Sequence, residues 1–515
     1  MLKKELLFRS ATVFLFVVMS VIGIVVSAYL IVTASTALLY WLAIAFLALS
    51  IISGIFNVSS AYSYYRSSFY EDHLKSIQSK LRPLEKLPSV AIAVPAYNED
   101  PKMVERNLLR LKEMNYDKEK MRIYLLDDST HENITKQLGE FCQTNGIVFL
   151  HRAERKGFKA GALNEMLKHS NEEFVALFDS DEYLTDINFL QDVLPYFNDP
   201  KLAFVQTEKR YAKGNFFSSC VDLFDAFFFK FIQPSRALNN TAIFAGSCGI
   251  IRRSALDKIG GFPEFVIEDT FFSFKSDITG FKSVYLPKVY ALGKPLTTFT
   301  DLVRQQWRYN YGDTQFLMHF IKNWKQNKRH TISALSKIDY ALHGLGLNYL
   351  SFILIAFTVV SIASVFASAP IAYVAVRQLL ALKYPPLNIE LFGLNAFLLS
   401  ILVPVAITKI YFNSISKGLM IFALNFALSF IRLKAAVAAL LNKSPVAGWI
   451  KGDVRHISGN IALALKNAKV ELTFATAIFA SSVFALINYN FSGAMWLLWY
   501  GILYSSTFFF FYKYG

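Results

Sequence analysis

The sequence predicts a parallel α/β domain inserted between two groups of membrane-spanning helices. The composition supports this mixed architecture, because 54% of the 515 residues are hydrophobic and 18% are charged. That is too apolar for a soluble protein and too charged for a chain that lies in lipid throughout. Long apolar runs stand near both ends of the chain, and strand-like and helix-like segments alternate between them. Such alternation is typical of a parallel sheet with helical crossovers.

The charge and the cysteines exclude several classes of protein. A formal net charge of +15 would suggest a nucleic-acid partner in a soluble protein. Here basic residues next to membrane spans on the cytoplasmic side explain it, so we expect no nucleic acid. The cysteines, Cys142, Cys220 and Cys248, have no paired spacing, and the histidines are isolated. These patterns predict neither a disulfide framework nor a zinc site.

Residues 1–63 are predicted to form a transmembrane hairpin. Apolar runs cover Ala11–Ala34 and Ala37–Val58, and each is long enough for the ~20 residues that cross a bilayer core. The first run resembles a signal peptide, but it is too long and leads directly into a second span. Both ends of the hairpin are therefore expected on the cytoplasmic side.

Residues 64–337 have the composition of a soluble domain, which we expect to be cytoplasmic. Its strands and helices are predicted from short apolar runs and from helical periodicity. The predicted strands are Val90–Val94, Met121–Leu126, Ile147–Leu150, Phe174–Phe178 and Leu202–Gln206. The predicted helices between them are Lys102–Met114, Glu132–Thr144, Ala160–Lys168 and Ile187–Phe197.

Two segments of this domain carry aromatic residues along one helical face. They are Phe216–Ile232 and Phe316–Trp324. Both are ordinary core-facing helices if the aromatic faces meet protein. Because the segments lie between two membrane regions and also carry lysines, we instead expect helices in the membrane interface, where aromatic and basic residues are favoured.

Residues 338–515 are predicted to return to the membrane. The segment Ile421–Leu441 is apolar but contains Arg432 and Lys434, and a central Arg or Lys costs about 2.5–3.5 kcal/mol on insertion scales. Basic loops on both of its sides are expected in the cytoplasm, so we interpret it as an interfacial helix. The predicted spans are Tyr349–Ser368, Leu391–Tyr411, Leu472–Tyr489 and Met495–Phe511, which makes six spans with the hairpin.

Polar motifs follow the predicted strands, at the positions where ligands bind in open parallel sheets. Asp179 and Asp181 come directly after the strand Phe174–Phe178. Two carboxylates one residue apart suit a hard divalent cation that also binds phosphate, although the pattern by itself is common in solvated loops. It occurs together with Val94–Asp100, Leu125–Thr130, Arg155–Asn164, Phe244–Arg253, Val266–Thr270 and Arg304–Gly312.

Each of these segments also has a plain structural alternative. In the functional interpretation, the carboxylate of Asp127 or Asp128 accepts hydrogen bonds from a base or ribose. In the structural alternative, it caps the next helix. The basic loop Arg155–Asn164 suits a diphosphate at a helix N-terminus, or else is merely solvated. Small residues in Phe244–Arg253 let a substrate approach the backbone, and Arg304–Gly312 combines guanidinium and aromatic groups that suit phosphate and sugar. The occurrence of all the motifs in one chain favours the functional interpretation.

The order and spacing of the motifs resemble those of the membrane-embedded family 2 glycosyltransferases. This family includes cellulose synthase, hyaluronan synthase and the cellulose-synthase-like glucan and mannan synthases. The resemblance extends from about Ala11 to Phe511, and Asp127–Thr130 followed by Lys156–Leu163 is most similar to the mannan and glucan enzymes. It implies an α/β domain of the GT-A fold, a Rossmann-like nucleotide-diphospho-sugar transferase, packed on helices that form a polysaccharide channel.

The resemblance also implies roles for particular residues. Asp179 and Asp181 would bind Mg²⁺ or Mn²⁺ on the diphosphate, and Asp269, next to Glu268, would be the catalytic general base. The residues that would bind the nucleotide sugar are Tyr97, Glu99, Asp128, Lys159, Asp179, Gln305 and Arg308. The residues that would bind the acceptor are Gly246, Ser247, Trp307 and Tyr309.

Three positions depart from the pattern of the family. Ile267 stands where threonine usually precedes the Glu-Asp pair. Tyr309 stands where tryptophan ends the Gln-x-x-Arg-Trp signature, which bears on the aromatic residue that caps the acceptor. The loop Lys451–Asp453 lies where the synthases carry a gating loop, but the threonine expected before the lysine is absent.

The resemblance implies inverting, processive transfer of a sugar from a UDP- or GDP-hexose to a growing β-linked polysaccharide, with export through the protein's own channel. The expected partners are the nucleotide sugar, a polysaccharide or lipid-linked acceptor, and the lipid bilayer of the cell membrane. Two alternatives stay open. One is transfer of a single sugar to polyprenyl phosphate or a glycolipid, which Tyr309 favours. The other is a transporter whose soluble domain only binds nucleotide.

Overall fold

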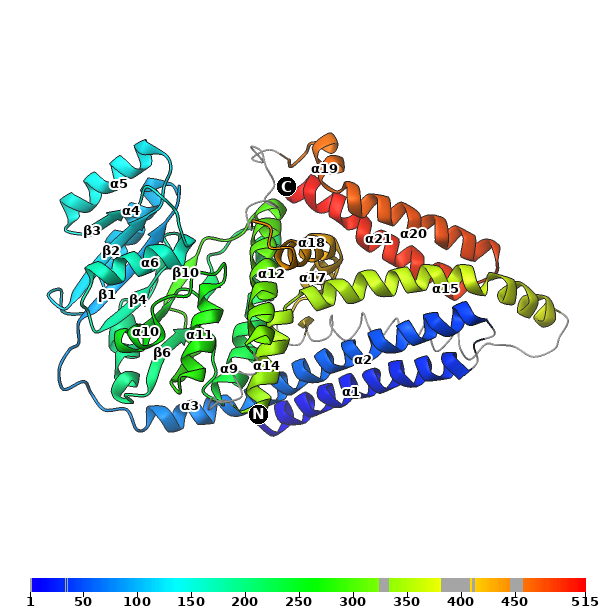
Figure 1. Ribbon diagram of the computed structural model, residues 1–515, viewed down its shortest axis with the longest axis horizontal. Coiled ribbons are helices and arrows are strands. Elements are labelled where there is room, and N and C mark those ends of the chain that lie inside the picture. Colours follow the sequence, from blue (N-terminus) through cyan, green and yellow to red (C-terminus); the bar gives the residue numbers. More distant parts are fainter. Residues whose placement is uncertain are drawn as a thin grey trace.

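An α/β domain and a bundle of long helices lie side by side (Figure 1). The structure is a computed structural model that describes residues 2–32, 34, 36–323, 333–380, 408–409, 413–444 and 457–515. Two helices, α12 (Phe299–Lys322) and α14 (Ala334–Leu345), stand between the domain and the bundle. They place the end of the soluble domain directly against the C-terminal helices.

The α/β domain is built on a seven-stranded sheet in the order β3-β2-β1-β4-β8-β6-β9. Strand β8 is antiparallel to both of its neighbours, and the other pairs are parallel. The strands are β1 (Val90–Ala96), β2 (Met121–Asp127), β3 (Val148–His151), β4 (Phe174–Leu177), β6 (Leu202–Thr207), β8 (Gly249–Arg252) and β9 (Lys282–Leu286).

The prediction of a purely parallel sheet is therefore wrong at β8. The five predicted strands are present, and their ends differ by only one or two residues. Gly249 at the start of β8 is paired with Leu177 at the end of β4. The chain thus enters β8 from a loop at the carboxyl edge of the sheet rather than from a helix that crosses its face, so β8 must run in the opposite direction.

Both faces of the sheet are buried. Along β1, Val90, Ile92 and Val94 belong to one hydrophobic core, and Ala91 and Ala93 belong to the other, because successive side chains of a strand alternate between faces. The small alanines share their core with α6. The helices of the domain are α4 (Pro101–Lys112), α5 (Glu132–Asn145), α6 (Phe158–His169), α7 (Phe189–Val193), α10 (Arg253–Ile259) and α11 (Glu268–Ile278).

Smaller elements complete the domain. The predicted helix Ile187–Phe197 is divided into α7 and a 3-10 helix, η2 (Leu194–Asn198), at a proline. A second, three-stranded sheet has the order β5-β10-β7. Its strands are β5 (Tyr183–Leu184), β7 (Arg210–Tyr211) and β10 (Ala291–Gly293), which are too short to give a sequence pattern.

The two aromatic segments bury their ring faces in protein. Phe217 is fully buried in a cluster with Phe299, and Phe316 near the end of α12 is fully buried against Phe271 of α11. These aromatic faces are therefore core-facing. Contact of the same helices with a membrane surface stays a prediction. Trp324 lies outside the described residues. The first segment forms α8 (Phe216–Phe227) and a π-helical turn, η3 (Phe228–Ile232), and α9 (Gln233–Ala237) follows it.

Long helices precede and follow the α/β domain. At the N-terminal side, α1 and α2 pack along each other (Figure 1). The N-terminal helices are α1 (Leu2–Val32), α2 (Ala37–Arg66), the 3-10 helix η1 (Ser67–Phe69) and α3 (Tyr70–Gln78). The C-terminal helices are α15 (Asn348–Leu380), α17 (Ile415–Ala427), α18 (Ser429–Leu440), α19 (Ile461–Asn467), α20 (Lys469–Ile487) and α21 (Phe491–Tyr514).

The segment Ile421–Leu441 is divided between two helices, and its placement at the membrane surface stays a prediction. It belongs to α17 and α18, which meet at a bend of 44°. Arg432 on α18 is fully buried, and its guanidinium group donates to Oε1 of Gln306 (2.9 Å) and to Oδ1 of Asn425 (3.0 Å). Protein amides, rather than water at a membrane surface, therefore solvate this arginine.

Within the described residues, four helical segments are long and apolar enough to cross a membrane, and the bent pair of α17 and α18 adds a fifth if it is one span. In α1, only the shorter stretch Ser20–Val32 is an apolar helix by the same measure. The predicted span Leu391–Tyr411 lies almost wholly outside the described residues, as does the loop Lys451–Asp453, so the six-span arrangement stays a prediction. The four segments are Ala37–Gln78, Asn348–Ala367, Lys469–Ile487 and Gly493–Tyr514.

We expect Gly312→Ala to weaken the packing of α12 against the start of α11. A Cβ atom at position 312 would lie 2.5 Å from Cγ2 and 2.9 Å from Cγ1 of Ile267, so the branched side chain must move. Overpacking of this kind costs about 1–3 kcal/mol, and the thermal unfolding midpoint in detergent should fall.

The matched control for this variant is Gly139→Ala in α5, where the nearest atom is a ring carbon of Phe149 at 3.3 Å. Its midpoint should stay or rise, because alanine favours a helix by about 1 kcal/mol over glycine. Equal midpoints for the two variants would contradict the described packing.

Candidate functional site

The candidate site lies at the carboxyl ends of β1, β2 and β4. Ala96 at the end of β1 is paired with Asp127 at the end of β2, and the amide of Asp128 donates to the carbonyl of Ala96 (2.9 Å). On the other side of β1, β4 leads into the loop with Asp179 and Asp181. The loops that follow these strands therefore leave the sheet side by side, at the edge where open sheets bind ligands.

Asp127 is a structural residue. It is fully buried and accepts hydrogen bonds from Oγ1 of Thr135 (3.0 Å) and from the amide of Ser129 (3.2 Å). Its carboxylate also lies 2.9 Å from Nδ1 of His151. These contacts join β2 to α5 and β3, so the side chain is fully used within the fold.

Asp128, which the resemblance assigned to the nucleotide, is bound by an arginine that the sequence analysis did not single out. Arg152 donates to it from Nε (2.8 Å) and from Nη2 (2.6 Å), and Nε of Arg155 is 3.8 Å away. The capping alternative does not apply, because the residue before α5 is His131 and no side chain caps that helix. The bidentate pair fixes the direction of the carboxylate.

Tyr97 and Glu99 lie beside this pair. The guanidinium carbon of Arg155 is 3.6 Å from the centre of the Tyr97 ring, which is a close stacking contact. The carboxylate of Glu99 accepts a hydrogen bond from the amide of Tyr97. Burial raises the pKa of Glu99 more than this bond lowers it, and the negative charge of Asp179 adds to the rise. An aromatic face with carboxylates around it suits a base and a ribose.

Lys159 connects three parts of the site. From the first turn of α6, its Nζ donates to Oδ1 of Asp179 (2.5 Å) and to the carbonyl of Gly246 (2.9 Å). A second ammonium group, Nζ of Lys209, lies 3.3 Å from Oδ2 of Asp179. Burial alone would raise the pKa of Asp179, but the two lysines bring it well below its usual value. Asp179 is therefore an anion at neutral pH.

Asp181 has the opposite electrostatic environment. Burial raises its pKa to about 7, and the negative charges of Asp179 and Glu182 contribute to the rise. Within the described residues, its side chain makes no hydrogen bond and no close ion pair. A cation beside Asp181 would favour its charged form and lower this pKa.

The carboxylates of Asp179 and Asp181 fit a divalent metal that is shared with a diphosphate. Mg²⁺ is often bound by one or two carboxylates together with substrate phosphates and water. Among the residues that the structure describes, no group of three or more His, Cys, Asp or Glu side chains could bind a metal without further ligands. Of the described residues, Asp179 and Asp181 would therefore need further oxygen ligands, such as those of a phosphate, to hold a metal.

Ser247 was assigned to the acceptor, and the structure corrects this. Its side chain is fully buried, and its hydroxyl donates to Oε1 of Glu182 (2.6 Å). Oε2 of Glu182 accepts from the amide of Asp179 (2.9 Å). Ser247 and Glu182 thus fasten the loop before β8 to the loop after β4, and Ser247 has no surface for a ligand.

Sequence reasoning missed Glu182, Gln206 and Lys209. Gln206 near the end of β6 accepts from the amide of Ala245 (2.7 Å) and donates to the carbonyl of Ser247 (2.9 Å). Lys209 lies two residues after the end of β6. The signal that would have found Gln206 and Lys209 is their place at the carboxyl end of a predicted strand, the same criterion that identified Asp179.

Gly246 brings Asp269 to the same place. Its φ of 83° lies in the left-handed region that favours glycine. A Cβ atom at this position would lie 3.1 Å from Oδ2 of Asp269 and 3.7 Å from Nζ of Lys159. Lys159 is bonded to Asp179 and lies near Gly246, as does Asp269. The carboxylates of Asp179 and Asp269, far apart in sequence, are therefore both close to the ammonium group of Lys159.

Glu268 and Asp269 occupy the first turn of α11, where the helix dipole favours negative charge. Burial raises the pKa of Glu268 to about 7, and the charge of Asp269 contributes to this. Burial also raises the pKa of Asp269, although Lys159 and Arg308 act in the opposite direction. A carboxylate with a raised pKa is a better proton acceptor at neutral pH.

Helix α12 contributes Arg308 and Tyr309 to the site. The guanidinium carbon of Arg308 is 5.4 Å from the centre of the Tyr309 ring. Arg308 is exposed to solvent. Partial desolvation lowers its pKa, but the nearby Tyr309, Glu268 and Asp179 raise it more. Gln305, one turn earlier, is partly exposed and makes no side-chain hydrogen bond within the described residues.

Trp307 does not lie with these residues, so its assignment to the acceptor is wrong. Its side chain is 5% exposed and packs with Tyr311 against alanines of α18. Residues two apart on a helix point in nearly opposite directions, so Trp307 faces away from Tyr309. The alanines are Ala435, Ala438 and Ala439.

Residues 91–260 match the sequence model of the family described as Glycosyl transferase family 2. The range contains Asp128, Lys159, Asp179, Asp181 and Gly246. Residues 91–260 are a family 2 glycosyltransferase domain. The match confirms, over that range, the resemblance that the motif order indicated, and the fold of the glycosyltransferase domain is GT-A-like with a mixed sheet.

The glycosyltransferase domain is similar to parts of several known proteins. The cellulose synthase catalytic subunit [UDP-forming] of Pseudomonas fluorescens is 34% identical over 239 residues, which are 45% of this chain and 32% of that protein. A probable glucomannan 4-beta-mannosyltransferase of Oryza sativa is 28% identical over 240 residues, 44% of this chain and 40% of that protein. The chain thus spans about a third of the length of the first of these relatives. A Pyrobaculum calidifontis mannosyltransferase in complex with GDP-Man and Mn2+ has a TM-score of 0.49 and 20% identity, over 78% of this chain and 99% of that chain.

Glu268→Gln should flatten the pH dependence of stability. The folded pKa of Glu268 is about 7, and a glutamate in an unfolded chain has a pKa of about 4.3. Between these values the folded state binds a proton that the unfolded state has released, so the contribution of this group to stability falls as the pH rises toward 7. The variant lacks this loss.

Thermal unfolding at about pH 5 and about pH 8 checks this. Between these two conditions, the free energy of unfolding of the variant should rise relative to that of the wild type by more than about 1 kcal/mol. The matched control is the exposed residue Glu264, and Glu264→Gln should gain nothing. Parallel pH profiles of the wild type and Glu268→Gln would contradict the described burial of Glu268.

Proposed function

We propose that the chain is an inverting, processive glycosyltransferase that adds hexose units from a UDP- or GDP-sugar to a growing β-linked polysaccharide. The observation that carries this proposal is the proximity of Asp269 to Gly246, Lys159 and Asp179. Asp269, a proton acceptor, and Lys159, a cation for a leaving diphosphate, then both lie next to Gly246, where any side chain would fill the space between them. The relationship of the domain to cellulose synthases and to a probable glucomannan mannosyltransferase supports a β-linked glycan as the product.

Tyr97, Glu99 and Asp128 bind the base and the ribose of the donor. The ring of Tyr97 offers a stacking face, and the two carboxylates accept hydrogen bonds from ribose hydroxyls or from N–H groups of the base. Arg152 holds Asp128 in one orientation before the donor arrives, so little conformational entropy is lost on binding.

Lys159, Arg308 and Gln305 bind the diphosphate. The two cations lie near Asp179 and offset the negative charge that builds on the leaving group. Asp179 and Asp181 fit Mg²⁺ or Mn²⁺, which when bound supplies further positive charge to the phosphates.

Asp269 is the general base of the transfer. It accepts the proton of the acceptor hydroxyl while that oxygen forms a bond to the anomeric carbon, from the face opposite the nucleotide. The bond between the anomeric carbon and the diphosphate oxygen breaks, and the nucleoside diphosphate leaves with the electron pair. An α-linked donor therefore gives a β-linked product.

Tyr309 and Gly246 bind the acceptor sugar. Tyr309 offers an aromatic face, and Gly246 offers exposed backbone.

Beyond the acceptor residues, the carbonyl of Asn310 on α12 accepts a hydrogen bond from Nδ2 of Asn348 at the start of α15 (3.0 Å). The side-chain oxygens of both asparagines are buried and make no hydrogen bond among the described residues. Such acceptors suit the hydroxyl groups of a sugar chain. They support a path for the glycan from the site toward α15.

The membrane helices provide the route for export. A polar polymer cannot cross hydrocarbon unaided, because its hydroxyl groups would lose their hydrogen bonds. We place residues 1–63 and 338–515 in and on the cell membrane, and residues 64–337 as a cytoplasmic catalytic domain between them. The contacts of α12 with α18 and of α15 with α18 support a channel that starts next to the active site.

Asp269→Asn should leave donor binding within about twofold of the wild type and lower turnover by about 10²–10⁴-fold, the usual contribution of a general base. The substitution keeps the shape of the side chain and removes the proton acceptor. Nucleoside diphosphate release and calorimetric titration with the donor measure the two quantities separately. The matched control is Asp257→Asn on α10, whose carboxylate pairs only with Arg253 at the surface. Wild-type turnover in Asp269→Asn would rule out its role as the base.

Product size and location test the processive and export steps. Purified protein in liposomes is given UDP-glucose, UDP-N-acetylglucosamine or GDP-mannose with Mg²⁺ or Mn²⁺. We expect one donor to release nucleotide and to give a polymer inside the vesicles, protected from an added glycosidase. A single sugar on added polyprenyl phosphate would instead identify a lipid-modifying enzyme. Flux without nucleotide release would identify a transporter.

A further inference from the structure

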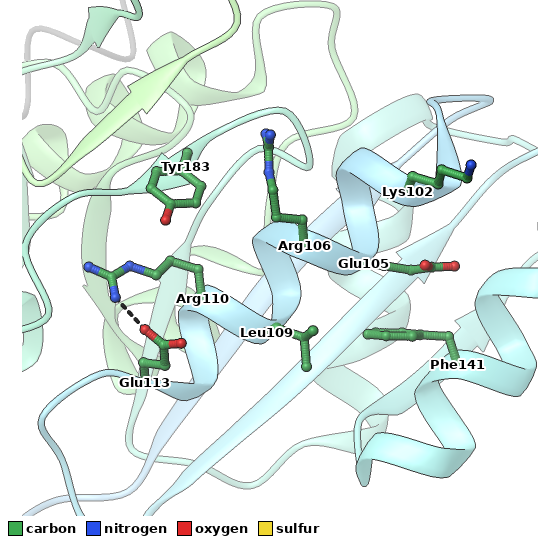
Figure 2. Close-up of a pocket in the computed structure, with 8 residues that line it drawn as sticks. All are labelled: Lys102, Glu105, Arg106, Leu109, Arg110, Glu113, Phe141 and Tyr183. Carbon is green, nitrogen blue, oxygen red and sulfur yellow. Dashed lines mark hydrogen bonds and ion pairs between the residues drawn. The ribbon is translucent and has the colours of Figure 1, made fainter.

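A pocket outside the candidate site lies between α4, α5 and the loop that carries β5. It has a volume of about 380 Å³, which is in the range of small-molecule sites. Figure 2 shows that its lining comes from one side of α4, with Tyr183 and Phe141 facing that helix from two directions. The residues that line it are Lys102, Glu105, Arg106, Leu109, Arg110, Glu113, Phe141 and Tyr183. None of them has a part in the proposed transfer.

Among the residues that the structure describes, two cations of the pocket have no acidic partner. Glu113 is paired with Arg110, and Glu105 accepts a hydrogen bond from Nε2 of Gln137 (2.8 Å). Arg106 donates only to the side chain of Asn107, at 3.3 Å, and Lys102 makes no side-chain bond within the described part of the chain. Arg106 and Lys102 are one turn apart on α4, so both ammonium and guanidinium groups are available to one anion.

Flat and apolar surfaces lie beside these cations. The ring of Tyr183 is 39% exposed, and the guanidinium carbons of Arg106 and Arg110 lie 5.4 and 5.8 Å from its centre. Leu109 is 43% exposed and stands next to Phe141 in the lining (Figure 2). Aromatic rings and guanidinium planes stack on nucleobases, and nearby cations bind phosphate.

The wall of this pocket is bonded to the loop that carries the metal-binding carboxylates. Nδ2 of Asn107 donates to the carbonyl of Ser180 (2.8 Å), and both residues are buried. Nε of Arg110 donates to the carbonyl of Leu184 (2.9 Å). Ser180 lies between Asp179 and Asp181, so a shift of α4 or of Tyr183 must displace the loop at the site.

We propose that this pocket binds a nucleoside phosphate, with the base against Tyr183 and the phosphate on Arg106 and Lys102. The bound nucleotide changes the affinity of the site for its donor through the loop 179–184. The binding step is independent of the proposed transferase function, whereas the effect on the donor rests on it.

Adenosine monophosphate is the probe, because it lacks the diphosphate that the proposed donor site binds. Calorimetric titration of the full chain in lipid nanodiscs should give a dissociation constant below about 1 mM, and Lys102→Ala/Arg106→Ala should raise it at least about tenfold. The matched control, Lys136→Ala/Lys201→Ala, removes the same charge from exposed positions outside the pocket and should not change the constant. In the wild type the probe should change KM for the sugar donor by about threefold or more, with no change in the pocket variant.

Separate outcomes decide each part. Absence of binding, or equal affinity in the wild type and the pocket variant, overturns the site. Equal affinity for inorganic pyrophosphate and the probe overturns the assignment to a nucleoside. Tighter binding of UDP or GDP than of the probe, lost in the pocket variant, identifies the reaction product as the ligand. Binding that leaves KM unchanged overturns the coupling. If no sugar donor supports turnover, the titration still decides the site, and only the proposed function fails.

Discussion

The distribution of charge at the carboxyl edge of the sheet constrains the rest of the site. A buried carboxylate is costly unless a cation compensates it. Lys159 and Lys209 lie within ion-pair distance of the half-buried Asp179. Burial and neighbouring acids raise the pKa values of Asp181 and Glu268 to about 7, although Lys209 and Lys159 act in the opposite direction. The acids at this edge of the sheet therefore differ in charge state near neutral pH.

Helix α12 connects that charged site with the membrane helices through opposite faces. Arg308 and Tyr309 are on the side of the site, and Trp307 packs on α18. Between them, Gln306 accepts a hydrogen bond from the fully buried Arg432 of α18. Helix α18 is therefore joined to α12 by a buried hydrogen bond, on the side of α12 that faces away from Tyr309.

The loop 179–184 is a second connection, on the opposite side of the site. It contains the two metal-binding candidates, and its backbone carbonyls at Ser180 and Leu184 are bonded to α4. Glu182 in the same loop accepts the hydroxyl of Ser247. The loop is therefore fixed from both sides by buried hydrogen bonds, so its position depends on how α4 and the loop before β8 are placed.

The sequence by itself determined the alternation of strands and helices and placed the Asp127–Asp128 pair and Asp179 at strand ends, because burial periodicity and strand ends are local properties of the chain. The roles of Asp128 and Asp269 came from the resemblance of their motifs to a known family. Only the tertiary structure decided the direction of β8, the face to which Trp307 points, and the arginine that binds Asp128. Each of these depends on a partner distant in sequence. A local pattern states that a side chain is buried or charged, but the packing of separate elements decides which side chain it meets.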